Sequence, residues 1–436
     1  MESSDAVVRR LRPASVLPFL AWAGFLVMQL ISPDRAWSWP LAGFSVLILA
    51  SYLWARTLRD QVTAGRRTQG TWVVAGDELV EQFTLTNHGW LPVLWARVRD
   101  GSSVPGYDVD RVETTPSVGE RRWSTTGVCQ RRGVFRLGPW DLEMADPLGI
   151  FTVTQHYPAA TTIMVYPRAS HLPNLELPRG RAPGRATSAQ YAAEETITVG
   201  GIRQYAQGDS LRRVHWPSTA RHNHLMVREF DREPSGDVWL IVDMDAEVQA
   251  GRDAEATQEY AVILAASLSG QFARSGERRG TGLLMSGRTP QMLPPARGQV
   301  QHWRILEALA LAEPAPGLSL DALLRQAHTS LGTGRTLVVI TPSADPAWVA
   351  PLLPLAARGN APTAVLLDAC TFDPPRGDGV GLLGLRDLLA RQRIPSYVLA
   401  QGFPFRPVER IRRQRREVRT LSGFGRVVTA DVAEEI

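Results

Sequence analysis

Lysine is absent from this 436-residue sequence, so its cationic side chains other than histidine are all arginines. The absence bears on nucleotide hydrolysis, because a phosphate-binding loop needs a lysine at the end of its glycine run. The stretch Gly332–Thr336 has arginine at that place, and it precedes an apolar run instead of following one. The sequence therefore disfavours a phosphate-loop nucleotidase.

Cysteine is nearly absent too, since only Cys129 and Cys370 occur in the chain. Two cysteines far apart argue against a disulfide framework, a thiolate zinc site and an oxidising compartment. We expect each of them to be a small buried apolar residue. The net charge of +5 is modest, and the length suffices for two or three domains.

Two long apolar runs stand near the N-terminus, Ala14–Ile31 and Trp37–Trp54. As a helix, each would extend roughly 27 Å, enough to cross the hydrocarbon core of a bilayer. A cleavable signal peptide is the alternative for the first run, and two core helices of a soluble domain are the alternative for both. The second run, the flanking charge and the lack of a small-residue cleavage site favour a transmembrane hairpin over residues 1–60.

Arginines flank the hairpin on its outer sides, whereas the connecting loop has only Arg35, which Asp34 offsets. The positive-inside rule then predicts a multi-pass protein of the inner (plasma) membrane, with both termini and the soluble domains in the cytoplasm. The flanking arginines are Arg9, Arg10 and Arg12 before the first run, and Arg56, Arg59, Arg66 and Arg67 after the second.

Residues 61–168 contain short strand-like runs at regular spacing, separated by turn signals. This spacing predicts an all-β, sandwich-like domain. The expected strands are Trp72–Val74, Leu79–Thr86, Val93–Val98, Val134–Leu137 and Thr162–Tyr166. Residues 169–199, rich in Pro, Gly, Arg, Ala and Ser, are typical of a linker.

Residues 200–405 alternate continuous apolar runs with stretches of helical periodicity. Continuous runs are typical of strands covered on both faces, so we expect an α/β doubly wound domain with a mostly parallel sheet. The expected strands are Val238–Val242, Gly282–Met285, Thr336–Ile340, Thr363–Leu367 and Ser396–Leu399, and the expected helices are 254–274, 300–311, 320–328, 347–357 and 382–392.

Three acidic residues, Asp243, Asp245 and Glu247, follow the first of these strands. Ligands of open α/β sheets bind at the carboxyl ends of the strands, and carboxylates there could hold Mg²⁺ or Ca²⁺. The alternative is a loop of solvated carboxylates, one of which caps the next helix.

The segment Gly200–Asp231 gathers arginines, acids and aromatics directly before this strand. Unpaired charge is costly to desolvate, so we expect either an internal ion-pair network or a surface that meets an acidic partner. The residues concerned are Arg203, Tyr205, Asp209, Arg212, Arg213, His215, Trp216, Arg221, Arg228 and Glu229.

Residues 406–436 form a basic C-terminal tail, with seven arginines between Arg406 and Arg419. This stretch predicts a basic helix, either lying on the anionic inner face of the membrane or fully solvated. Nucleic acid is disfavoured as a partner, because no recognised binding fold accompanies the charge.

Several of these motifs, in this order, resemble the signature of the domain of unknown function 58 family. They are Gly201–Tyr205, Gly208–Asp209, Leu211–Arg213, Trp216, Ala220–Arg221 and Leu225–Phe230, preceded by Arg132–Pro139, Asp146–Phe151 and Val165–Arg168. The resemblance implies a membrane-anchored protein with a β domain and a von Willebrand factor type A-like domain. It also implies a MoxR-type AAA+ ATPase and other membrane proteins as partners.

The metal site of type A domains begins Asp-x-Ser-x-Ser, and this sequence departs from it. Asp243 matches the aspartate, but Asp245 and Glu247 replace both serines, and Asp345 could stand for the later acidic ligand. Three carboxylates would weaken the capture of a partner carboxylate by the ion, whereas plain binding of Mg²⁺ or Ca²⁺ stays open. At His215 the family often has aspartate.

The sequence offers no evident catalytic constellation, so we expect a protein-binding scaffold or adaptor and no enzyme. It would face the cytoplasm from the membrane and act with the ATPase in a chaperone-like or envelope-related assembly. One alternative is a metal-dependent enzyme that uses Asp243, Asp245 and His215. The other is a purely structural envelope protein.

Overall fold

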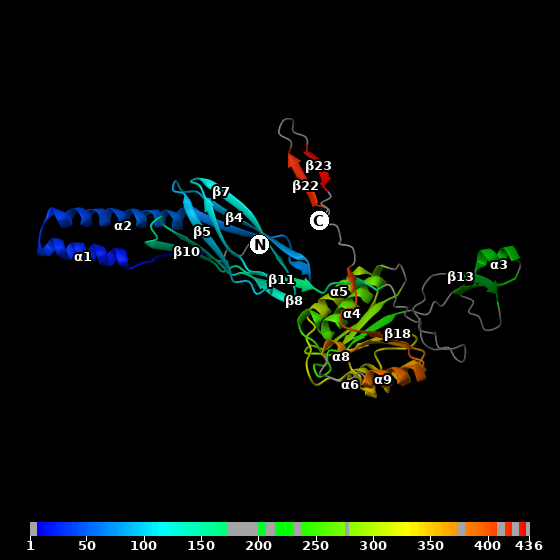
Figure 1. Ribbon diagram of the computed structural model, residues 1–436. Helices are drawn as coiled ribbons and strands as arrows, with labels where there is room; N and C mark the ends of the chain where they lie inside the picture. The colour runs from blue at the N-terminus through cyan, green and yellow to red at the C-terminus, as the bar shows by residue number, and fades with distance from the viewer. Residues whose placement is uncertain are drawn as a thin grey trace. The chain divides into compact units, whose positions relative to one another are not determined.

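The chain folds into two compact units in the computed structural model, one formed mainly by Met1–Arg168 and the other by most of the remaining chain (Figure 1). The structure describes residues 7–172, 199–205, 214–222, 224–230, 237–274, 279–373, 380–407, 415–420 and 427–432.

The first unit begins with two apolar helices that pack side by side, α1 (Leu17–Ile31) and α2 (Arg35–Gln61) (Figure 1). The Asp34 side chain accepts a hydrogen bond from the Ala36 amide and thereby caps α2 two residues before the expected start. By length and composition, α2 could cross a membrane, and α1 is a shorter apolar helix. These observations give weak support to a membrane location.

Helix α2 does not end at Trp54 as expected but continues into the core of the β-rich part. Ala55 and Leu58 are buried there, and so is Val62, the first residue of the following strand β2 (Val62–Thr68). Helical periodicity explains the arrangement, because Ser51, Ala55 and Leu58 lie on one face of the helix. The second apolar run is therefore both a candidate span and a core helix.

Three sheets share this core of buried residues, in agreement with a β-rich domain. The first sheet has the order β1-β10-β9-β5-β6, the second β2-β4-β7 and the third β3-β11-β8. Their remaining strands are β1 (Val8–Pro13), β3 (Trp72–Val74), β4 (Glu78–Asn87), β5 (Val93–Asp100), β6 (Asp110–Thr115), β7 (Gly119–Val128), β8 (Gly133–Leu137), β9 (Trp140–Ala145), β10 (Phe151–Tyr157) and β11 (Thr161–Tyr166).

The five strands expected from sequence are present, but six others were missed. Strand β1 is the clearest example, because its arginines suggested a charged flank before a membrane run. Its Leu11 packs against the core and alternates with the exposed Arg10 and Arg12, as a strand at the edge of a sheet requires. Both cysteines are free, and Cys129 is buried in this core.

Arg66 joins two of the sheets through buried ion pairs. Its guanidinium donates to Glu81 on β4 and, at 2.7 Å, to Asp100 on β5. Tyr107 donates its hydroxyl to the same Glu81. Arg66 therefore cannot serve as an exposed flanking charge of the hairpin, as the sequence analysis took it to be, whereas its neighbour Arg67 is exposed.

The second unit contains a six-stranded sheet with the order β17-β16-β15-β18-β19-β20. All neighbouring strands are parallel except β16 and β17. Five of the strands match the apolar runs: β15 (Val238–Val242), β16 (Thr281–Met285), β18 (Thr336–Thr341), β19 (Ala361–Leu367) and β20 (Ser396–Leu399). The sequence missed β17 (Gln291–Ala296), because Pro294 and Pro295 argue against a strand except at an edge, where β17 lies.

Helices pack on both faces of this sheet. Trp239 and Ile241 of β15 share a buried cluster with residues of α6 (Leu320–Ala327), α7 (Leu352–Ala357) and α9 (Val380–Arg391). Leu240 points to the opposite face, where α4 (Thr257–Arg274) contacts four of the strands. The other helical segments are α5 (Gln299–Ala310), α8 (Ala369–Phe372) and the short 3-10 turns η2 (Asp253–Glu255) and η3 (Pro346–Val349).

The structure bears only in part on the predictions for the linker and the tail, because residues 173–198 lie outside the described residues. The linker begins with a strand, β12 (Ser170–His171), that pairs with β21 (Arg406–Pro407) of the tail. Within the tail, β22 (Arg415–Thr420) pairs with β23 (Val427–Val432), so this part is a strand hairpin and not a basic helix. Arg410, Arg412 and Arg413 lie outside the described residues.

Replacing Arg66 by methionine tests the buried ion pairs. Arg66→Met should lower the free energy of opening of strands β2 and β4 by about 3–5 kcal/mol, because it leaves two buried carboxylates without their cation. Amide hydrogen exchange of the full-length protein in detergent measures that free energy locally. Arg67→Met is the matched control and should change it by less than about 0.5 kcal/mol. Equal effects of the two substitutions would contradict the structural role of Arg66.

Candidate functional site

The strand order of the six-stranded sheet reverses between β15 and β18. From β15 the chain passes to β16 on one side, and β18 then lies on the other side of β15. The loops that leave the carboxyl ends of β15 and β18 therefore diverge. Such a switch point is where open α/β sheets bind their ligands.

Asp243 lies at this point, directly after β15, and only 1% of its surface is exposed. One of its carboxylate oxygens accepts a hydrogen bond of 2.6 Å from the Thr341 hydroxyl at the end of β18. The other accepts the amide of Asp245 at 3.1 Å. This bond between side chains 98 residues apart ties the two diverging loops together.

Burial governs the protonation of Asp243. Desolvation raises the pKa of its carboxyl from the ordinary value of 3.8 to about 6. The hydrogen bonds from Thr341 and from the Asp245 amide act in the opposite direction, because they favour the charged form. Asp243 thus changes its charge close to physiological pH.

The loop after β15 is held by bonds to its own backbone. Asp245 is 6% exposed, and its side chain accepts the Glu247 amide at 3.2 Å. Gln249 donates to the carbonyl of Asp243, and Ser286, just after β16, accepts the amide of Met244 at 2.8 Å. Glu247 is exposed at the outer side of the loop.

The loop after β18 supplies hydroxyl groups. Thr341 also accepts the amide of Ser343 at 2.9 Å, and the Ser343 hydroxyl accepts the amide of Asp345 at 3.3 Å. Asp345 is exposed, and its carboxylate caps η3 by accepting the Ala347 amide at 3.0 Å. Sequence reasoning missed Thr341, Ser343 and Ser286, although hydroxyl residues directly after predicted strands were a usable signal.

The four carboxylates predicted as metal ligands differ in their surroundings. Asp243 and Asp245 are buried and bonded within the chain, whereas Glu247 and Asp345 are exposed. Among the residues that the structure describes, no three His, Cys, Asp or Glu side chains come together as a group that could hold a metal ion. The residues as placed do not fit a ligand set, and binding of Mg²⁺ or Ca²⁺ stays a prediction.

The arginine-rich segment is described only in part. Strands β13 (Val199–Gln204) and β14 (Met226–Phe230) pair as an antiparallel hairpin that carries α3 (Trp216–His222). His215 lies 2.8 Å from the Ser218 hydroxyl, and Trp216 is 67% exposed. Tyr205 is half-buried and Arg221 is exposed, whereas Asp209, Arg212 and Arg213 lie outside the described residues.

Arg203, Arg228 and Glu229 belong to the paired strands, where Arg203 is opposite Val227, Arg228 is opposite Ile202 and Glu229 is opposite Gly201. The choice between an internal ion-pair network and a partner surface stays open for this segment.

Part of the chain is similar to a protein family and to several known proteins. Residues 201–360 match the model of the family described as protein of unknown function DUF58. The uncharacterized protein Rv1480 of Mycobacterium tuberculosis is 28% identical over 183 residues, which cover 40% of this chain and 56% of that protein. Uncharacterized protein YeaD of Bacillus subtilis is 25% identical over 187 residues, covering 43% and 44%. The chain thus spans about half the length of the curated relatives it matches.

Likenesses to solved structures are remote. Proximal thread matrix protein 1 from the mussel byssus has a TM-score of 0.27 and 12% identity, with coverage of 35% of this chain and 41% of that one. A CARDB domain from Pyrococcus furiosus has a TM-score of 0.18 and 12% identity, covering 24% and 86%. Scores this low define neither fold nor function.

The raised pKa of Asp243 predicts a pH-dependent stability. The folded protein binds more protons than the unfolded chain between about pH 4 and 6, so this group's contribution is present below pH 4 and is lost as the pH rises through 6. Asp243→Asn has no titrating group at this position, so its stability does not fall in this way as the pH rises. The unfolding free energy of the variant minus that of the wild type should therefore rise by on the order of 2–3 kcal/mol between pH 4 and 7.

Urea unfolding of the full-length wild type and variant at both pH values measures this difference. Asp345→Asn, at an exposed carboxylate, is the control and should show a change below about 0.5 kcal/mol. A difference that stays constant with pH would mean that Asp243 titrates as an ordinary carboxyl.

Proposed function

We propose that this chain is a membrane-anchored protein-binding module that docks a partner protein at the carboxyl edge of its α/β sheet. The bond between Thr341 and Asp243 carries the proposal, because it organises the two loops at the switch point where such sheets bind ligands. Glu247 and Asp345 offer exposed carboxylates from these same loops. An acidic rim of this kind suits a basic surface on the partner.

The α/β unit is, in this proposal, a von Willebrand factor type A-like domain. A central parallel sheet with helices on both faces and an acid at the end of its first strand supports that assignment. The resemblance of the motifs to the domain of unknown function 58 family suggests the partner, a MoxR-type AAA+ ATPase, together with other membrane proteins. The module would act as a scaffold or adaptor in a chaperone-like or envelope-related assembly.

The anchor in this proposal is a two-helix hairpin in the inner (plasma) membrane. The length and apolar composition of α2 support one span. Helix α1 is shorter, about 22 Å at 1.5 Å per residue, and would cross with its flanking residues drawn toward the interface. The exposed arginines next to the hairpin, such as Arg10 and Arg56, favour cytoplasmic soluble units.

Site-specific photo-crosslinking in the native cell tests the docking edge. A photoreactive amino acid in place of Glu247 should crosslink to an AAA+ ATPase, because that side chain stands exposed at the carboxyl edge. The same substitution at Arg358, exposed near the amino end of β19, is the matched control and should give little or no such product. Mass spectrometry of the crosslinked band identifies the partner.

Two results would contradict the proposal. If both positions crosslink with equal yield, the carboxyl edge is not the docking site. If neither position gives a product that contains an ATPase, the proposed partner is wrong, and this result does not bear on the membrane anchor.

A further inference from the structure

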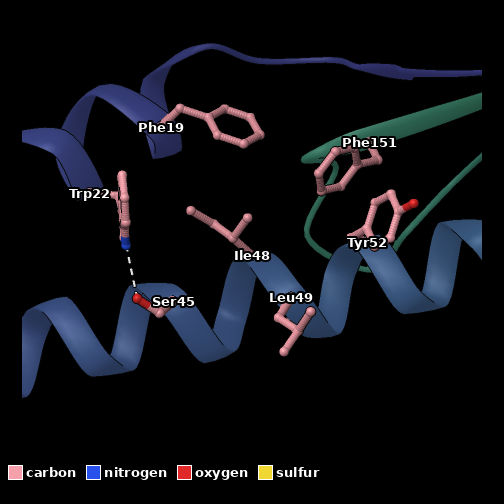
Figure 2. A pocket seen from close by; sticks show the side chains of 7 residues that line it. All are labelled: Phe19, Trp22, Ser45, Ile48, Leu49, Tyr52 and Phe151. Atoms are coloured by element: carbon pink, nitrogen blue, oxygen red, sulfur yellow. Dashed lines mark hydrogen bonds between the residues drawn. The ribbon is translucent and has the colours of Figure 1, made fainter.

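An apolar groove lies between the two N-terminal helices and the first strand residue of β10. Its volume is about 420 Å³, within the range of pockets that bind small ligands. Figure 2 shows the Trp22–Ser45 pair at one end and Tyr52 with Phe151 at the other. The lining residues are Phe19, Trp22, Ser45, Ile48, Leu49, Tyr52 and Phe151.

The groove is suited to an apolar occupant. Trp22 donates its indole N–H to the Ser45 hydroxyl at 2.8 Å, and that hydroxyl donates to the Leu41 carbonyl at 2.7 Å. These polar atoms are therefore satisfied within the chain and offer little to a polar ligand. Phe151 meets both Phe19 and Tyr52 edge to face, with ring centroids 5.8 and 5.7 Å away, and closes the far end with aromatic surface.

The groove fits within one leaflet. Its residues on helix α2, from Ser45 to Tyr52, rise about 10 Å, and half of the hydrocarbon core of a bilayer measures about 15 Å. Tyr52 lies one turn before Arg56 on a similar face of the helix. With Arg56 at the level of the headgroups, the groove would extend toward the middle of the bilayer beside a lipid chain.

A cation stands at the headgroup end. Arg56 is exposed, and its nearest acid is Asp60, 3.9 Å away, which already accepts a closer bond of 2.8 Å from Arg59. Arg12 of β1 is opposite Thr152, whereas Phe151 of the groove is opposite Pro13, so Arg12 lies on the other face of the sheet from the groove. An apolar groove that ends at an exposed arginine complements an acyl chain with an anionic headgroup.

We propose that this groove binds one acyl chain of an anionic glycerophospholipid of the cytoplasmic leaflet, with its phosphate beside Arg56. The inference rests on the proposed membrane anchor. It adds a specific lipid site to that anchor, where the two helices meet the β-rich core.

Native mass spectrometry of the full-length protein released from nanodiscs tests the site. The discs contain equal amounts of phosphatidylglycerol and phosphatidylcholine with the same acyl chains. We expect one phosphatidylglycerol to stay bound to the wild type. Ile48→Trp fills the groove and should lower this retention at least about fivefold, because a packed site cannot admit the chain.

Val46→Trp is the matched control for the groove. Val46 is 67% exposed and lies about 200° around the helix from Ile48, so retention should equal that of the wild type. Arg56→Gln should lower the preference for phosphatidylglycerol roughly fivefold. Arg35→Gln, at the other end of α2, should leave it unchanged.

Three results would overturn the lipid site. They are equal retention by Ile48→Trp and Val46→Trp, no retained lipid in the wild type, and no preference between the two headgroups. Alkaline extraction of native membranes distinguishes failure of the lipid site from failure of the membrane anchor. If the protein resists extraction but retains no lipid, the anchor is supported and the lipid site is rejected. If the protein is extracted, both proposals are rejected.

Discussion

The continuity of α2 with the β-rich core is the constraint on which the first unit depends. Leu58 and Val62 are fully enclosed in that core, while the start of the same helix is apolar and exposed. Burying a leucine or valine side chain stabilises a fold by about 1.5–3 kcal/mol. The helix therefore cannot swing about a joint at its end without giving up this burial. Any membrane segment in α2 is consequently rigidly connected to the sheets, and the antiparallel pairing of β1 with β10 secures the chain before α1 in the same way.

The sequence predicts the α/β sheet better than the β-rich sheets, for a physical reason. Strands buried on both faces, such as Val238–Val242, are continuous apolar runs, and their limits agree with the structure to within two residues. Strands with one exposed face mix polar and apolar residues, so β7 and β1 resemble loops or charged flanks in sequence. Strand β17 was missed because it contains two prolines, which a strand tolerates only at the edge of a sheet, and the sequence does not show that β17 lies at an edge.

Only one of the two loops that form the candidate site could be predicted from the sequence. Asp243 follows an evident strand, so its place at the carboxyl edge could be deduced from sequence alone. Its bond to Thr341 depends on which strand lies next to β15, and strand order is a property of tertiary packing. Arg66 illustrates the same limit, since nothing local reveals that an arginine after an apolar helix is paired with Glu81 and Asp100 in a core.

The bonds of Asp243 determine how a partner could use the carboxyl edge. Asp243 is 1% exposed, and each of its oxygens accepts a hydrogen bond that holds these loops, so the loops would have to open before a cation or a partner arginine could reach it. Leaving a buried donor unsatisfied costs about 1–3 kcal/mol. Glu247 and Asp345 have exposed side chains, and the Ala347 amide that Asp345 accepts lies at the exposed start of η3. Direct contacts are therefore expected at the rim, while Asp243 holds the loops that present it. Because its pKa lies near 6, protonation of this one buried group changes the charge directly beneath the rim.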